Sequence, residues 1–198
     1  HWFCQTLGTH ELLRQQQEGV DAYILLDEQA QTVPAGCGGL LYFPYLMGER
    51  CPLFDADARG AFWGIDSTMG KGHFARAVLE GVAYSLRQVY DLTRSPEDGA
   101  PECIVVCDGG SKSGLWRQIL ADVFQLPVCT TGGAAEGSDY GAALLAGVAG
   151  GFWHDTEEAA AQCRLLTRLE PCPERREAYE KQYARYCALY RSMTNKER

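Results

Sequence analysis

The 198-residue sequence is poor in basic side chains: it has 18 lysines and arginines against 26 aspartates and glutamates, a formal net charge of -8. Nucleic acids and anionic membranes both favour a basic surface, so we expect neither as a partner. Long apolar runs are also lacking, and the one around residues 40–46 is far too short to cross a bilayer. The chain opens on His1 with neither an initiator methionine nor a signal peptide, and we expect a processed chain or a fragment.

Paired cysteine motifs are absent as well. The nine cysteines include no pair spaced as Cys-x-x-Cys, and the four histidines lack the spacing of metal ligands. An odd number of cysteines also does not suit a disulfide framework. We therefore expect no bound metal, and reduced, buried or half-buried thiols in a cytoplasmic protein. Cys103 and Cys107 lie in a β-branched run that reads as a strand, which would turn both side chains to one face.

Apolar side chains are plentiful, at 46% of residues, and they follow two periodicities. Short apolar runs alternate with segments of helical spacing, which predicts an α/β fold. The expected strands are 40–43, 60–65, 103–107 and 126–130. The expected helices are pieces of 1–35, then 71–93, 113–124, 140–149, 156–165 and 174–193. Small residues in 140–149 predict a helix that packs closely on a sheet.

The two longest expected helices each carry a stripe of large side chains. The stripe in helix 71–93, which residues 95–99 should end, is expected to be buried and consists of Phe74, Val78, Val82, Leu86 and Val89. Glu80 and Arg87 of the same helix are expected to be solvated or paired. The stripe in helix 174–193 consists of Tyr179, Tyr183, Tyr186 and Tyr190. We expect these tyrosines to pack, either in the core or against a partner chain in a possible homodimer.

The segment from Asp108 to Gly114 is the most informative part of the sequence. A strand, a Gly-Gly turn and the start of a helix follow one another here. Glycine allows close approach of a ligand to the backbone, and free amides at a helix start favour an anion. It is neither a Walker A loop nor a dinucleotide fingerprint. From these residues alone, phosphate binding and a purely structural turn are equally good interpretations.

Residues 44–59 form a loop that carries charges of both signs among prolines and aromatics. Long ordered loops are often functional, and paired carboxylates can do acid–base work. We favour a structural interpretation, in which arginine–carboxylate pairs pin the loop. Ser111 and Ser113 have no base nearby in a known nucleophile arrangement, so covalent catalysis has little support.

Several motifs in order along the chain resemble the FGGY family of carbohydrate kinases. Residues 60–65 (Gly-Ala-Phe-Trp-Gly-Ile) and 73–80 (His-Phe-Ala-Arg-Ala-Val-Leu-Glu) resemble its second signature. Residues 43–60 look like the Glu-Arg-x-Pro loop of xylulokinases and gluconokinases. Residues 108–122 resemble the nucleotide loop and the helix after it, and residues 141–153 resemble a late helix and its turn. The resemblance covers essentially the whole chain.

The resemblance implies an actin-like (ribonuclease H-like) α/β fold, with a mixed sheet flanked by helices. It implies that residues 1–198 are the C-terminal, nucleotide-binding domain. The sugar-binding domain, the catalytic aspartate and a Gly-Thr phosphate loop would lie upstream of this chain, which leaves no catalytic residue and no metal ligand within it. ATP and Mg²⁺ are the implied cofactors, and the γ-phosphoryl group would pass to a sugar hydroxyl. Xylulose is the first expected sugar; gluconate or another sugar or polyol is the second.

The resemblance also implies a set of nucleotide-binding residues: Gly109, Gly110, Ser111, Lys112, Ser113 and Gly114. Gly109, Gly110 and Ser111 would lie against phosphates and ribose, and Ser113 or Gly114 near adenine. Lys112 would either neutralise phosphate charge or simply be solvated. Asp108 stands where xylulokinases commonly have a third glycine, although glycerol kinases carry Asp-Gly-Gly. An alternative from another class is a non-catalytic, actin-like nucleotide-binding module.

Overall fold

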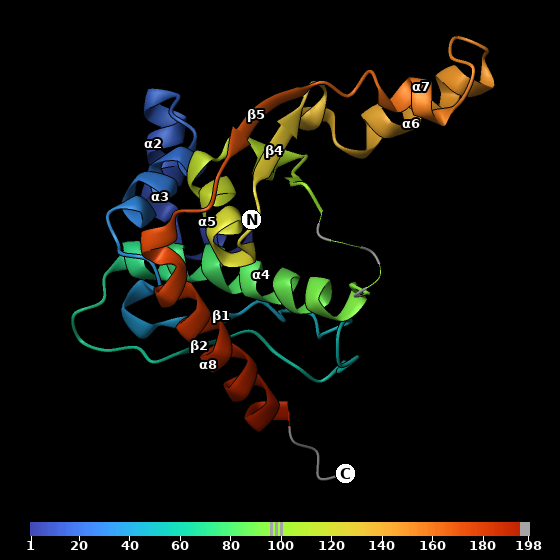
Figure 1. Ribbon diagram of the computed structural model, residues 1–198. Coiled ribbons are helices and arrows are strands. Elements are labelled where there is room, and N and C mark those ends of the chain that lie inside the picture. The colour runs from blue at the N-terminus through green and yellow to red at the C-terminus, as the bar shows by residue number, and fades with distance from the viewer. Residues whose placement is uncertain (96, 98, 100, 195–198) are drawn as a thin grey trace. The chain divides into compact units, whose positions relative to one another are not determined.

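A computed structural model of the protein describes residues 1–95, 97, 99 and 101–194 (Figure 1). The chain forms two compact units. Unit 1 comprises His1–Gly99 and Cys172–Arg198, and unit 2 comprises Ala100–Pro171. Each unit is described by itself.

Unit 1 is mainly helical and contains a two-stranded sheet. Its elements are α1 (Trp2–Leu7), α2 (Thr9–Glu18), α3 (Ala22–Gln31), the 3₁₀ turn η1 (Cys37–Gly39), β1 (Leu41–Phe43), β2 (Ala61–Trp63), α4 (Lys71–Thr93), η5 (Pro173–Arg175) and α8 (Arg176–Thr194). Strands β1 and β2 are antiparallel, with Leu41 opposite Trp63. Helix α4 packs against α3 and β1, and α8 contacts both α4 and β1 (Figure 1).

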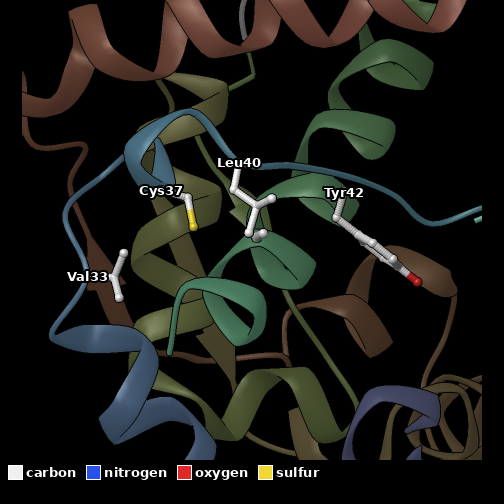
Figure 2. Close-up of a cluster of buried hydrophobic side chains, with 5 residues drawn as sticks. Val33, Cys37, Leu40 and Tyr42 are labelled. Carbon is white, nitrogen blue, oxygen red and sulfur yellow. The ribbon is translucent and has the colours of Figure 1, made fainter. Parts of the chain in front are cut away.

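The core of unit 1 lies where the chain passes from α3 into β1. Val33, Cys37, Leu40 and Tyr42 form a buried cluster with Ala77 of α4 (Figure 2). The tyrosines of α8 extend this apolar interior. The ring of Tyr186 stacks on Phe43 with 4.7 Å between centroids. Tyr179, Tyr186 and Tyr190 are all buried, which confirms that this stripe packs and places these three rings in the core of unit 1 rather than on a partner-facing surface.

Helix α4 has the expected bounds, but a different face of it is buried. Of the expected stripe, Leu86 is 46% exposed, and the other four side chains are only half-buried. The buried apolar face consists of small residues together with one tyrosine: Ala75, Ala77, Gly81, Ala83 and Tyr84. Gly81 lies so close to the carbonyl oxygen of Tyr42 that a Cβ there would overlap it. The expected stripe is therefore wrong for Leu86, whereas Phe74 and Val78 are partly buried against the core cluster. The most deeply buried positions are small because close approach of a helix to a strand needs small side chains.

Glu80, expected to be solvated or paired, is paired and fully buried. Arg76 Nε donates to Glu80 Oε1 at 2.7 Å, and Arg76 Nη2 donates to the Tyr179 hydroxyl at 2.8 Å. The backbone N–H of Gly36 donates to the same Glu80 oxygen at 3.1 Å. Two buried charges persist only when they are paired and hydrogen-bonded, so this network ties α4 to α8 and to the turn before η1. Arg87, the other charged residue singled out in this helix, pairs with Glu180 of α8 at 2.9 Å.

Unit 2 is an α/β unit built on a three-stranded mixed sheet. Its elements are β3 (Ile104–Val105), η3 (Gly109–Lys112), α5 (Gly114–Phe124), β4 (Val128–Thr131), η4 (Ala134–Glu136), α6 (Ser138–Ala149), α7 (Thr156–Ala160) and β5 (Leu165–Leu169). The strand order is β3-β4-β5. Strand β3 is parallel to β4, and β5 is antiparallel to β4. The α/β fold with a mixed sheet is thus confirmed.

Several expected elements of unit 2 need correction. The strand expected at 103–107 contains only Ile104 and Val105. The helix expected at 156–165 ends at Ala160, and strand β5 follows it. Strand β5 is exposed over most of its length, so it lacks the alternation of buried and exposed residues that marks a strand in a sequence. The small residues of α6 do not pack on the sheet: the helix contacts η4 and α7, and only Gly147 is buried.

Two further expectations concern the cysteines and the end of α4. All nine cysteines are free thiols. Cys51 and Cys107 are exposed, so the expectation of buried or half-buried thiols is wrong for these two.

Helix α4 ends at Thr93, before the segment 95–99 that was expected to end it. Pro96 and Asp98 of that segment lie outside the described residues.

Candidate functional site

Two glycine-rich turns follow the parallel strands of unit 2. Turn 1 (residues 108–113) leads from β3 into α5, and turn 2 (residues 132–137) leads from β4 into α6. The register pairs Val105 with Cys129, so the carboxyl ends of β3 and β4 lie at the same edge of the sheet. In open α/β sheets, ligands bind outside the carboxyl ends of the strands. This edge is therefore the candidate site of unit 2.

Hydrogen bonds within the chain fix the shape of turn 1. The carbonyl of Asp108 accepts from Ser111 N at 3.0 Å and from Ser111 Oγ at 2.7 Å. Ser113 caps α5, because its Oγ accepts from Trp116 N at 2.9 Å. Both serine hydroxyls thus have structural partners, which agrees with the lack of support for a serine nucleophile. Lys112 is exposed, as expected for a solvated lysine.

The two glycines of turn 1 have different surroundings. A Cβ at Gly110 would lie 3.0 Å from Trp116 Nε1, so this glycine makes room for the tryptophan ring. A Cβ at Gly109 would meet nothing within 4 Å, and the same is true of Gly114 at the start of α5. As the first residues of a helical turn, Gly109 and Gly110 also have amides without an acceptor inside that turn. Gly109 is therefore the glycine of turn 1 whose backbone is open to a ligand.

Turn 2 was not singled out from the sequence, although it repeats the pattern of turn 1. The N–H of Asp108 donates to Ala134 O at 2.7 Å and so joins the two turns. The carboxylate of Asp108 also lies directly against Gly137, where a Cβ would overlap it. Asp108 adopts φ 60°, an uncommon conformation for a residue other than glycine. The strand–Gly–Gly–helix pattern of residues 128–140, already used for turn 1, was the sequence signal that could have revealed turn 2.

The structure thus brings all six expected nucleotide residues together at one edge of unit 2. Gly109, Gly110, Ser111 and Lys112 form η3, Ser113 caps α5, and Gly114 is the first residue of that helix.

The thiol of Cys103, the residue just before β3, stays protonated at neutral pH. A hydrogen bond with Cys129 and burial both raise its pKa.

Hydrogen bonds between charged side chains and the backbone pin loop 44–59. The carboxylate of Glu49 is buried, and its Oε2 accepts from the backbone N–H groups of Leu53 at 3.0 Å and Asp55 at 3.4 Å. Arg59 donates to the carbonyl oxygens of Ala56 and Ala58. Bonds between side chains and the backbone therefore help to pin the loop, and the expected arginine–carboxylate pairs stay a prediction.

Within the described part of the chain, no three histidine, cysteine, aspartate or glutamate side chains are grouped so that they could hold a metal ion. A search of the same residues finds no helix that is long and apolar enough to span a membrane.

Comparison with known proteins places the chain among kinases. The sequence profile described as "FGGY family of carbohydrate kinases, C-terminal domain" matches residues 1–150. The xylulose kinase of Bacillus subtilis (strain 168) is 35% identical over 161 residues, which are 81% of this chain and 30% of that protein. The gluconokinase of Bacillus licheniformis is 32% identical over 194 residues, 98% of this chain and 38% of that protein.

Solved structures agree with the sequence comparison. The ligand-bound xylulose kinase from Lactobacillus acidophilus superposes with a TM-score of 0.78 at 29% identity, over 96% of this chain and 38% of that one. The chain thus spans between 30% and 38% of the length of these relatives. Its fold is that of the actin-like sugar kinases, and the chain belongs to the FGGY family of carbohydrate kinases, whose C-terminal domain it matches.

Proposed function

We propose that residues 1–198 are the nucleotide-binding domain of an ATP-dependent sugar kinase, and that turn 1 binds the nucleotide. The observation that carries this proposal is the open backbone of Gly109 at the carboxyl edge of two parallel strands. None of the residues that the structure describes fills the space beside this glycine, whereas Gly110 next to it serves the packing of Trp116. A glycine without an internal packing partner, in a family of kinases, fits close contact with a ligand.

In the proposed reaction, the γ-phosphoryl group of ATP passes to a sugar hydroxyl. Such catalysis depends mainly on positioning and on charge stabilisation. The residues of this chain would hold the nucleotide: Gly109 and Gly110 through backbone contact, Ser111 and Ser113 by fixing the turn, and Gly114 by leaving room beside α5. Mg²⁺, carried with the nucleotide, would neutralise phosphate charge. The proton acceptor and the sugar site would belong to an upstream domain.

For the sugar, we propose xylulose first and gluconate second. Relatives named xylulose kinase and gluconokinase both support the proposal, at 35% and 32% identity. A non-catalytic module with the same fold is a weaker alternative, because these relatives are named kinases. We also propose a cytoplasmic location, which free thiols favour because that compartment is reducing.

The test of nucleotide binding compares two neighbouring glycines. Gly109 is outside the left-handed region and has open space beside it, so Gly109→Val should fold normally. We expect this variant to weaken ATP binding about tenfold or more in a ligand-detected NMR titration, because the new side chain occupies the ligand's place. Gly110→Val should instead lower the melting temperature, because it displaces Trp116. An unchanged affinity in a normally folded Gly109→Val variant would show that turn 1 is structural.

A further inference from the structure

We infer that turn 2 is a second nucleotide-contacting segment, with Gly132 as its contact residue. This inference rests on the proposed function, because it concerns the same nucleotide. Turn 2 follows β4 and precedes α6, whereas turn 1 follows β3 and precedes α5. Three features of unit 2 support it: the surroundings of the glycines, the link between the turns, and the geometry of the edge.

The glycines of turn 2 repeat the arrangement found in turn 1. A Cβ at Gly133 would lie 2.6 Å from the ring of Tyr140, just as a Cβ at Gly110 would press on Trp116. Both rings come from the first turn of the helix that follows, α6 in one case and α5 in the other. The second glycine of each turn is therefore explained within the chain: Gly110 by packing on an aromatic ring, and Gly133 by such packing together with its left-handed φ of 85°.

The first glycine of each turn has no such explanation. A Cβ at Gly132 would meet nothing within 4 Å, as at Gly109. Neither residue has the left-handed φ that would require glycine for conformational reasons. The amide of Gly132 is also already used, since it donates to Arg164 O at 3.0 Å. The open face of its Cα is what remains for a ligand to contact.

Asp108 of turn 1 contacts turn 2 at two points and so joins the two turns. Its N–H bonds Ala134 O, and its carboxylate rests against Gly137, so it contacts turn 2 near the middle and at the end. The parallel register ends at Val105 and Cys129, and beyond it turn 1 lies beside turn 2 where η3 contacts η4. A nucleotide that contacts Gly109, the residue after Asp108, therefore meets turn 2 beside it. The left-handed strain at Asp108 is the kind that persists at ligand sites, where the surroundings enforce it.

The experiment measures ATP binding to the 198-residue chain by amide chemical shifts. In the parent chain, ATP should shift the amide signals of residues 109–114 and also those of residues 132–134. Gly132→Val should raise the Kd for ATP about tenfold while the melting temperature stays unchanged. The matched control is Gly70→Val in unit 1, at another glycine with open space and no left-handed φ, and it should leave the Kd within about twofold of the parent.

The outcomes separate this inference from the proposed function. If Gly109→Val weakens binding and Gly132→Val does not, turn 2 makes no contact and the inference is wrong while the proposed function stands. If ATP shifts no signal in the parent chain, or if neither variant weakens binding, both are wrong. The parent shifts at residues 132–134 decide the matter even if Gly132→Val fails to fold.

Discussion

At the scale of single residues, Glu11 shows how neighbours set the charge of a buried group. Its carboxyl is 1% exposed and accepts hydrogen bonds from Gln29 Nε2 at 2.7 Å and Lys71 Nζ at 2.9 Å. Burial alone raises the pKa of a carboxyl, but these two donors outweigh it, and the pKa of Glu11 lies below its ordinary value of 4.5. The folded state therefore favours the ionised carboxylate more than the unfolded chain does.

The sign of the pH effect follows from this lowered pKa. The stabilisation by Glu11 is fully present above pH 4.5 and is lost as the pH falls through the folded-state pKa. We expect Glu11→Gln to cost about 1–3 kcal/mol of unfolding free energy at neutral pH, because Lys71 loses its charged partner. The difference from the parent should shrink below pH 4.5 in urea unfolding series run at several pH values. A difference that does not change between pH 7 and pH 3 would contradict this account.

Little of this residue-scale detail could be predicted from the sequence. Glu11 is a charged residue in the first turn of α2 and resembles a solvated side chain until Gln29 of α3 and Lys71 of α4 bond to it. Its partner Lys71 is 60 residues away. Turn 1 was predicted from local order, because strand, Gly-Gly and helix start are contiguous. Local order does not distinguish Gly109 from Gly110, since the ring of Trp116 makes that difference.

At the scale of elements, the contact between α4 and β1 depends on backbone proximity. Gly81 faces the Tyr42 carbonyl, and Gly72 faces the Gln29 carbonyl of α3, where a Cβ would lie 2.6 Å from the oxygen. Periodicity predicted the bounds of α4 correctly but missed its most deeply buried positions. It ranks large apolar residues as buried, whereas this helix approaches its neighbours through alanine and glycine. The pairing of Arg76 with Glu80 in that interface is likewise invisible to a hydrophobic pattern.

Substitution of Gly81 tests this contact, because helix propensity and packing have opposite effects there. Replacing a helix glycine by alanine normally stabilises a protein by about 1 kcal/mol. For Gly81→Ala we expect a loss of about 1–3 kcal/mol instead, because the methyl group forces α4 away from β1. Gly141→Ala in α6, with open space beside it, is the control and should be neutral or stabilising. The measurement is thermal unfolding, and a higher melting temperature for Gly81→Ala would rule out the contact.

At the scale of the whole molecule, the motifs predicted the family and the fold class, but not the two units. Family motifs are local and ordered, so residues 60–80 and 108–122 are recognisable without the structure. Unit 1, in contrast, is completed by α8, which returns to the first part of the chain after unit 2. That return depends on packing between α8 and β1, which no local pattern specifies.

We have proposed that this chain binds the nucleotide and that another domain supplies the sugar site and the proton acceptor. We therefore expect this chain to bind nucleotide but not to transfer the phosphoryl group. Its relatives are about three times as long, and transfer requires a carboxylate, a sugar and the phosphates in one arrangement. We expect no sugar-dependent ADP formation by the 198-residue chain with xylulose or gluconate, measured by a coupled assay. ADP production that rises with sugar concentration would place the whole active site within this chain.

The late return of α8 has a consequence for how the protein is made. The Tyr45 and Tyr186 hydroxyls meet at 2.8 Å across 141 residues of chain, and Phe43 is covered by the same helix. At a synthesis rate of about 5–20 residues per second, β1 waits on the order of ten seconds for the tyrosines that bury it. During that interval the aromatic surface of β1 is uncovered, while unit 2 emerges from the ribosome as one continuous segment. The nascent chain is therefore most in need of a chaperone while unit 2 is being synthesised, between the appearance of β1 and that of α8.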